Sequence, residues 1–371
     1  MQKSEGQSPF ALARRRVRTT THLKRPRYRQ NVQTDHRIVT GDARELDLPS
    51  DSVDLVITSP PYPMIEMWDD VFADLDPAIG DALDAGEGDR AFEAMHDVLD
   101  TVWAELARVL RPGGIAAINV GDATRTLDRF QQYPNAAEIT RRLREHGLDP
   151  LPDILWRKPA NSAAKFMGSG MIPPNAYPTL EHESILLFRN GERRSFPPGD
   201  DDRYESAYFW EERNRWFSDL WELTGTNQAV EAGLRERSGA FPLEIPLRLI
   251  RMFSVYGDTV LDPFWGTGTT TMAALLEGRN SVGYELDGEF RAAFDQRLAD
   301  VTDRSRTLAS DRLDGHRQWV DDRESDDLAY EAEHYDTPVR TKQERGIRFY
   351  VVESVESTPE GYRATHVPFQ P

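Results

Sequence analysis

The chain has 371 residues, of which 39% are hydrophobic, and it contains no cysteine. This length can support one large core or two smaller ones, and no apolar stretch is long enough to span a bilayer. The first twenty residues carry arginines without the apolar block of a secretory signal, so we expect a soluble, cytoplasmic protein with no membrane partner. The lack of cysteine excludes disulfides, thiolate metal sites and cysteine nucleophiles, and no metal site is expected.

The formal net charge of −18 is unevenly distributed along the chain. Residues 1–37 hold ten basic residues against Glu5 and Asp35, so this arm carries +8 and the remainder carries −26. A basic arm on an acidic body fits phosphate attraction at one surface, and a disordered tail without a partner fits equally well. Only five of the 45 basic residues are lysine, and this composition is typical of a halophilic protein.

Apolar runs and helical stripes alternate along the chain, which predicts an α/β fold whose parallel sheet is covered on both faces. The expected strands cover residues 36–40, 53–57, 115–120, 153–156, 184–188, 259–261 and 281–284, and the expected helices cover 91–110, 136–146, 242–255, 269–277 and 288–299. Residues 64–90 are weakly patterned and predict a loop with one helical piece.

Composition suggests three segments: a basic N-terminal arm (1–33), a central domain (34–300), and a charged linker or exposed helices leading to a C-terminal extension (301–371). In the extension, two strands near 346–354 and 361–369 are expected to pair as a hairpin. Within the central domain, residues 189–240 are rich in charged and aromatic residues but lack periodicity. This stretch is either a substrate-recognition insert or a long surface excursion.

A glycine-containing loop, DPFWGTGTT at 262–270, follows the strand expected at 259–261. Gly266 and Gly268 allow the backbone to approach a ligand closely, and Thr269 can cap the next helix. The loop lacks the lysine of a phosphate-cradling motif, which disfavours nucleoside triphosphate hydrolysis. Glu285 ends the next strand, where an acid can accept hydrogen bonds from ribose hydroxyls. Each feature alone is as typical of a tight turn or a surface acid, but together they indicate an adenosine-containing cofactor.

A second strand-end motif, SPPYP at 59–63, directly follows the apolar run at 53–57. Pro60 and Pro61 restrict the backbone and fix nearby carbonyls and the Ser59 hydroxyl beside the Tyr62 ring. Such a corner can accept hydrogen bonds from an amino group and stack on the ring that bears it. A stiff turn or a peptide ligand is the alternative, but the buried strand before the motif argues against an exposed peptide.

The two motifs resemble those of the amino-methyltransferases, which use S-adenosylmethionine to methylate exocyclic nitrogens of nucleobases. SPPYP precedes DPFWGTGTT in the chain, which resembles the family members whose catalytic motif comes before the cofactor motif. Other segments are similar to that family: Gly41-Asp42-Ala43, Leu110-Arg111-Pro112-Gly113-Gly114, Trp156-Arg157-Lys158-Pro159, and Phe241-Pro242 with Arg248-Leu249-Ile250. The resemblance covers roughly residues 34–300. It implies a Rossmann-like class I methyltransferase fold with a mixed, mainly parallel seven-stranded sheet and helices on both faces.

The resemblance also implies roles for individual residues. The S-adenosylmethionine site would comprise Asp42 near the adenine, Glu285 on the ribose, and Asp262, Pro263, Phe264, Gly266, Gly268 and Thr269 toward the methionine end. The target base would be held by Ser59, Pro60, Pro61 and Tyr62. Serine in the first position resembles cytosine-N4 members, whereas aspartate or asparagine is more usual in adenine-N6 members. Cytosine is therefore favoured, and adenine remains open.

The chemistry of an amino group fits this corner. The amino lone pair of cytosine is delocalised into the ring and must become tetrahedral before it can attack a sulfonium methyl group. Acceptors at Ser59 and Pro60 would favour that geometry and help to remove the proton, while Tyr62 stacks on the extruded base. Methylation of cytosine carbon 5 needs a thiolate adduct instead, which a chain without cysteine cannot form.

The nucleic acid is less well defined by the sequence. Arginines of the 189–240 insert are candidates for contacts with DNA bases or for solvated surface charges: Arg193, Arg194, Arg203, Arg213 and Arg215. Its aromatic residues could stack on unpaired RNA bases or belong to the core: Tyr204, Tyr208, Phe209, Trp210 and Trp216. Residues 63–68 also differ from the sequence expected after the tyrosine.

The leading hypothesis is a site-specific DNA methyltransferase that forms N4-methylcytosine, as the protective half of a restriction–modification system with a restriction endonuclease partner. A ribosomal RNA cytosine-N4 methyltransferase is the closest alternative. An adenine-N6 DNA methyltransferase and a non-catalytic nucleic-acid-binding protein are the others.

Overall fold

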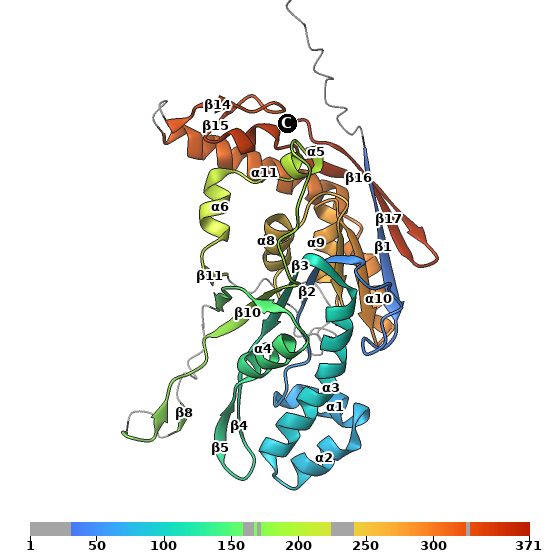
Figure 1. Cartoon of the computed structure of the whole chain (residues 1–371), viewed down its shortest axis with the longest axis vertical. Coiled ribbons are helices and arrows are strands. Elements are labelled where there is room, and N and C mark those ends of the chain that lie inside the picture. The colour runs from blue at the N-terminus through green and yellow to red at the C-terminus, as the bar shows by residue number, and fades with distance from the viewer. Residues whose placement is uncertain (1–30, 159–166, 169–171, 224–240, 324–326) are drawn as a thin grey trace, which may run out of the picture.

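The computed structural model describes residues 31–158, 167–168, 172–223, 241–323 and 327–371. Most of the basic N-terminal arm, Pro159 and residues 224–240 of the 189–240 insert therefore lie outside the described residues. Figure 1 shows the described chain as a large central sheet with helices packed on both of its faces. Within these residues, no helix combines the length and apolar character needed to cross a bilayer.

Seven adjacent strands form the centre of the sheet. In spatial order they are β7 (Ile154–Arg157), β10 (His182–Arg189), β3 (Leu110–Val120), β2 (Val53–Thr58), β12 (Thr259–Asp262), β13 (Asn280–Glu285) and β1 (Val32–Thr40). Of these seven strands, β10 is antiparallel to both of its neighbours and the other six share one direction. The predicted mixed, mainly parallel sheet is confirmed.

Further strands widen this sheet at both ends. β11 (Leu220–Glu222) pairs with β7, β6 (Asp149–Pro150) pairs with β10, and a hairpin of β16 (Tyr350–Thr358) and β17 (Gly361–Pro368) pairs with β1. The described sheet therefore has eleven strands rather than seven. The C-terminal hairpin lies where it was expected, and it continues the sheet that also carries the catalytic motif.

Two hydrophobic cores lie on opposite faces of the sheet. One core contains side chains of α8 (Glu244–Phe253), α9 (Thr269–Leu276) and α10 (Glu289–Arg297), and the other contains those of α3 (Gly88–Val109) and α4 (Asn135–Glu145). Along β2, Leu55 and Ile57 belong to the first core and Val56 to the second. This alternation follows from the two-residue period of a strand, and it explains why the middle residues of β2, Leu55, Val56 and Ile57, are all apolar.

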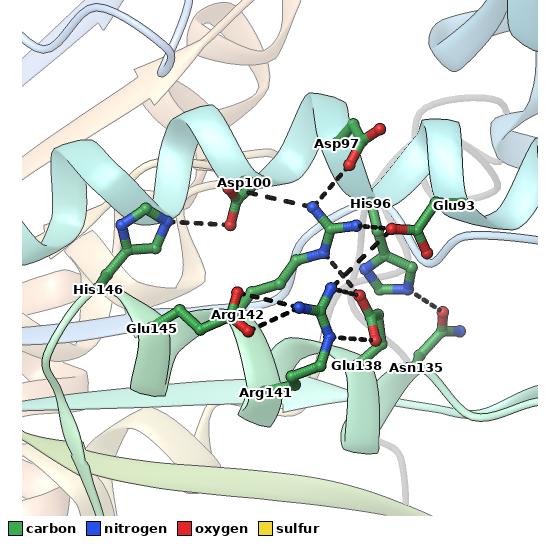
Figure 2. A network of polar contacts seen from close by, with 10 residues as sticks. All are labelled: Glu93, His96, Asp97, Asp100, Asn135, Glu138, Arg141, Arg142, Glu145 and His146. Carbon is green, nitrogen blue, oxygen red and sulfur yellow. Dashed lines mark hydrogen bonds and ion pairs between the residues drawn. The ribbon is translucent and has the colours of Figure 1, made fainter.

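An ion-pair network joins α3 to α4 (Figure 2). The Arg142 guanidinium is 5% exposed and contacts Glu93, Asp97 and Glu138 at 2.7 Å each. Three carboxylates around one guanidinium satisfy its donors, so burial of this charge is tolerated. The network ties α4 to α3, and Asn135, the first residue of α4, lies beside His96 of α3.

The region 64–90 differs from its prediction. Instead of a loop with one helical piece, it contains the short helix η1 (Glu66–Trp68) followed by α1 (Asp69–Leu75) and α2 (Pro77–Asp84). The Asp76 side chain accepts a 3.0 Å hydrogen bond from Ala78 N, and Pro77 occupies the first turn of α2. This Asp-Pro pair is a helix-start signal in the sequence. Ala91 onward was correctly predicted as a long helix, α3.

The C-terminal and insert segments are also helical in part. α11 (Val301–Asp321) occupies the expected linker and packs against β16. The insert contains α5 (Asp201–Glu205) and α6 (Trp210–Trp216), and α6 is tied to α11 by ion pairs from Glu212 to Arg312 and from Glu211 to His316. Phe209 and Trp216 are fully buried, so these two aromatic residues belong to the core.

Candidate active site

The two sequence motifs meet at the carboxyl ends of β1, β2, β12 and β13. A cavity of about 440 Å³ lies there, within the range of small-molecule sites. Of the predicted site residues, it is lined by Asp42, Ser59, Pro61, Pro263, Phe264, Gly266 and Glu285. The fold thus brings residues 59–62, the predicted catalytic corner, and the glycine loop into one site, as expected for the carboxyl edge of an α/β sheet.

Glu285 organises the glycine loop from the end of β13. Its Oε2 accepts a 2.8 Å hydrogen bond from Gly266 N, and its Oε1 accepts a 3.0 Å bond from Asp287 N. Burial raises the pKa of this carboxyl, although these backbone donors oppose the rise. Each oxygen keeps a further lone pair at the cavity wall, so Glu285 can accept hydrogen bonds from ribose hydroxyls.

Asp262 connects the two motifs from behind the cavity wall. Its Oδ1 accepts hydrogen bonds from Thr58 Oγ1 at 2.7 Å and from Phe264 N at 3.1 Å. The side chain is buried, and this burial raises its pKa to about 6. Asp262 does not line the cavity, so its observed role is to hold the loop rather than to face a ligand.

Gly268 and Thr269 have structural roles that differ from those expected. Gly268 has φ = +74°, and a Cβ atom there would lie 2.5 Å from Phe294 and 2.6 Å from Trp265. The glycine is therefore required by packing on these two rings. Gly268, not Thr269, is the N-cap of α9, and no side chain caps this helix. Neither residue lines the cavity.

Asp42 lies on the cavity wall with a partner that the sequence analysis did not identify. Both carboxylate oxygens are engaged by Arg44, including a 2.7 Å ion pair. Burial alone would raise the pKa of Asp42, but the hydrogen bonds and charge of Arg44 outweigh it and lower the pKa. Asp42 is therefore an ionised acceptor, and Arg44 adds a positive charge to the same wall.

A second part of the cavity was missed because 64–90 was expected to be a loop. Trp68, Val71, Phe72 and Leu75 line the cavity from α1 and the residue before it. These apolar residues follow the spacing i, i+3, i+4 and i+7, which is the signal that could have identified them. They provide an apolar wall suited to the flat face of a nucleoside base.

The catalytic corner is held by hydrogen bonds among side chains. Ser59 Oγ lies 2.9 Å from Tyr62 Oη, which also receives a 2.8 Å bond from Asn119 Nδ2 and donates a 3.0 Å bond to Glu183 Oε2. Burial, followed by the charge of Glu183, raises the pKa of Tyr62 well above its ordinary value. Tyr62 is therefore a neutral phenol. Pro60 is buried beneath the corner.

The chain leaves this corner through an unusual turn. Met64 has φ = +67°, a left-handed conformation that is uncommon for residues other than glycine. Asn135 supports the turn by donating 3.0 Å hydrogen bonds from Nδ2 to the carbonyls of Pro63 and Gly121. Burial lowers the pKa of His96 to about 4, so its neutral ring can donate to Asn135 Oδ1 at 3.1 Å and fix the amide (Figure 2).

The arginines that are candidates for contacts with DNA bases lie at the other edge of the sheet from Ser59. Arg193 and Arg194 follow the antiparallel strand β10, and Arg213 lies on α6, which precedes β11. Both positions are at the amino ends of the parallel strands, whereas Ser59 is at the carboxyl ends. Arg194 pairs there with Asp258 at 2.6 Å and Asp54 at 3.2 Å. The three arginines therefore lie at the sheet edge opposite Ser59, and their contact with DNA bases stays a prediction.

Comparison with known proteins places this site in a family. Residues 53–296 match the model of a family described as DNA methylase. The Type II methyltransferase M.MthZI of Methanothermobacter thermautotrophicus is 45% identical over 326 residues, which are 86% of this chain and 91% of that protein. M.MjaI, a Type II methyltransferase of Methanocaldococcus jannaschii, is 48% identical over 281 residues, covering 72% of this chain and 92% of that protein.

A similar solved structure agrees with these matches. TTHA0409 from Thermus thermophilus, complexed with S-adenosyl-L-methionine, is 34% identical and superposes with a TM-score of 0.56 over 71% of this chain and 93% of that chain. The Rossmann-like methyltransferase fold is thereby confirmed. The chain belongs to the DNA methylase family, the group of amino-methyltransferases that its two strand-end motifs resemble.

Proposed function

We propose that this protein is a site-specific DNA methyltransferase that transfers a methyl group from S-adenosylmethionine to the N4 amino group of cytosine. The observation that carries the proposal is the single cavity lined by both Ser59 and the glycine-loop residues Phe264 and Gly266. A nucleophile that is held at Ser59 can thus reach a methyl donor that is held by the loop. Membership of the DNA methylase family supports DNA as the substrate.

The cavity residues suit S-adenosylmethionine. Glu285, held by the Gly266 N–H, would accept from the ribose, and Asp42 would face the adenine side. The apolar residues Phe72 and Phe264 would cover flat or aliphatic parts of the ligand. When bound, this cofactor supplies an electrophilic methyl group on a positively charged sulfur. The other functions required of the site are performed by the chain's own residues.

The catalytic corner prepares the amino nitrogen. Ser59 Oγ and the Pro60 carbonyl accept N–H hydrogens, which draws the nitrogen toward a tetrahedral geometry and directs its lone pair. Tyr62 provides the flat face against which an extruded base stacks. Serine at position 59 resembles the cytosine-N4 members of the family, whereas the adenine-N6 members more usually carry aspartate or asparagine at this position.

We extend the class of the two close relatives to this chain. Both relatives carry the name Type II methyltransferase, and similarity spans most of each protein. We therefore propose that the chain is the modification enzyme of a restriction–modification system. Its methylation would protect a recognition sequence from a restriction endonuclease of the same specificity.

The test is to incubate the full chain with labelled S-adenosylmethionine and either duplex DNA or ribosomal RNA, and to digest the product to nucleosides. The expected product is N4-methylcytosine from DNA. N6-methyladenine would overturn the choice of base, and label confined to RNA would overturn the choice of polymer. No transfer to either, with cofactor binding demonstrated by calorimetry, would overturn catalysis itself.

A further inference from the structure

A polar cluster, buried except for Lys158, lies behind the catalytic corner and is formed by the ends of four strands. Tyr62 follows β2, Asn119 belongs to β3, Glu183 belongs to β10 and Lys158 follows β7. Asn119 Nδ2 contacts both Tyr62 Oη at 2.8 Å and Glu183 Oε2 at 2.7 Å, and Tyr62 Oη donates to the same Glu183 oxygen at 3.0 Å. The Lys158 ammonium contacts the other Glu183 oxygen.

The strand register brings this glutamate to the tyrosine. Ser184 pairs with Val120, so Glu183 lies opposite Gly121 at the end of the β3–β10 ladder. A Cβ atom on Gly121 would lie 3.3 Å from both the Glu183 side chain and the Tyr62 ring. The glycine thus lets both side chains lie close to the backbone, and the Glu183 side chain is only 13% exposed.

Counting donors and acceptors fixes the direction of each hydrogen bond. A phenol has one hydrogen and accepts through its oxygen lone pairs, and a carboxylate only accepts. The Tyr62 hydroxyl lies 3.0 Å from Glu183 Oε2, which only accepts, so the single hydrogen of Tyr62 goes to Glu183. Asn119 donates from its NH₂ group to Tyr62 Oη and Glu183 Oε2, because its carbonyl oxygen would face the carboxylate as a second acceptor. Because the only hydrogen of the Tyr62 hydroxyl is used by Glu183, the hydrogen bond between Tyr62 and Ser59 must be donated by the Ser59 hydroxyl.

We infer that Glu183 is a positioning residue that acts through Tyr62 to hold the Ser59 hydroxyl as a hydrogen-bond acceptor toward the substrate. With its hydrogen committed to Tyr62, Ser59 presents only lone pairs to the cavity. An amino group can then donate a hydrogen bond to Ser59 Oγ. A base with a carbonyl at that position would instead place its oxygen, a hydrogen-bond acceptor, against the lone pairs of Ser59. This inference rests on the proposed function, because it concerns the same transfer to an amino nitrogen.

The variant E183Q tests the inference with little change of shape. A glutamine can donate to Tyr62 Oη, which frees the tyrosine hydrogen to point at Ser59 and turns the Ser59 hydrogen toward the substrate. We expect kcat for methyl transfer to fall about 100-fold, while KM for DNA and the Kd of S-adenosylmethionine change less than about twofold. Full activity of E183Q would overturn the inference.

E181Q is the matched control. Glu181 lies two residues before Glu183 and pairs with Arg157 at 3.8 Å, so the substitution removes the same charge beside a cation of the neighbouring strand. It leaves the Tyr62 contacts in place, and kcat should stay within about twofold of the wild-type value. A loss equal to that of E183Q would show that the charge at this sheet edge matters rather than the Tyr62 hydrogen bond, and would overturn the inference.

A double-mutant cycle separates positioning from a merely structural role. In Y62F the ring remains but the hydroxyl that links Glu183 to Ser59 is gone, so E183Q should cause no further loss of kcat in that background. An equal loss in both backgrounds would overturn the inference. The proposed function fails separately: wild-type protein that forms only N6-methyladenine overturns the cytosine assignment, yet the same cycle remains valid because adenine also presents an amino group.

Discussion

The Thr58 hydroxyl donates a 2.7 Å hydrogen bond to the Asp262 carboxylate, and this bond joins two motifs that are 204 residues apart in sequence. Thr58 immediately precedes Ser59, and Asp262 begins the glycine loop. Both side chains are buried. The distance between the loop and the catalytic corner therefore depends on a contact behind the cavity.

The raised pKa of Asp262 predicts how stability depends on pH. Burial raises this pKa to about 6, against an ordinary value of about 3.9 in an unfolded chain. Between about pH 4 and 6 the folded state therefore holds a proton that the unfolded state has lost, so the free energy of unfolding falls as pH rises. D262N removes this effect, because its neutral amide can still accept from Thr58.

Urea unfolding of wild type and D262N across this pH range measures the effect. The stability of D262N relative to wild type should increase with pH by up to about 3 kcal/mol, the equivalent of the pKa difference. A constant difference between the two proteins from pH 4 to 7 would contradict a raised pKa at Asp262. Because the comparison is relative, other carboxyl groups contribute equally to both curves.

Replacing the catalytic serine tests the assignment of the corner. S59A removes the acceptor that faces the amino group, so methyl transfer should fall at least about 100-fold while calorimetry still detects S-adenosylmethionine binding. S52A is a matched control at the opposite end of β2, where the Ser52 hydroxyl donates only to the Pro49 carbonyl among the contacts described. Its kcat should be unchanged within about twofold. A fully active S59A would refute the assigned role.

The strand-end motifs were predictable because their position depends only on local sequence. Apolar runs precede Ser59 and Asp262, and parallel strands bring their carboxyl ends to one edge. The direction of β10 was not predictable in this way, since a buried strand has the same apolar pattern in either direction. This reversal sends the chain after β10 to the amino edge, and it explains why Arg194 pairs with Asp54 and Asp258 far from the cavity.

The support beneath the catalytic corner was also invisible in the sequence. Asn135 lies at the start of a helix and is fully buried, yet it holds the carbonyls of both Pro63 and Gly121. Only tertiary structure brings these segments together. N135A should leave two buried carbonyls without this donor and lower the free energy of unfolding by about 3 kcal/mol.

Chemical denaturation compares N135A with N214A, a control on the exposed face of α6 where the side chain accepts a bond from Arg213. The control should change stability by less than about 0.5 kcal/mol. If N135A were equally mild, the hydrogen bonds to Pro63 and Gly121 would not be holding the turn. A large effect on stability with a parallel loss of kcat would link the turn at Met64 to the catalytic corner.

The final prediction concerns Gly268, which was expected to make room for the cofactor. Its left-handed backbone and its close approach to Trp265 and Phe294 indicate that an added methyl group would be both strained and overpacked. G268A should therefore cost more than about 3 kcal/mol of stability. Gly147 is the matched control, because it also has a positive φ, of +88°, but no atom of the described residues lies within 4 Å of a Cβ atom there. G147A should cost only about 1 kcal/mol. Thermal unfolding without cofactor separates the two explanations, since equal melting temperatures for G268A and G147A would show that the glycine serves the ligand rather than the packing of the two rings.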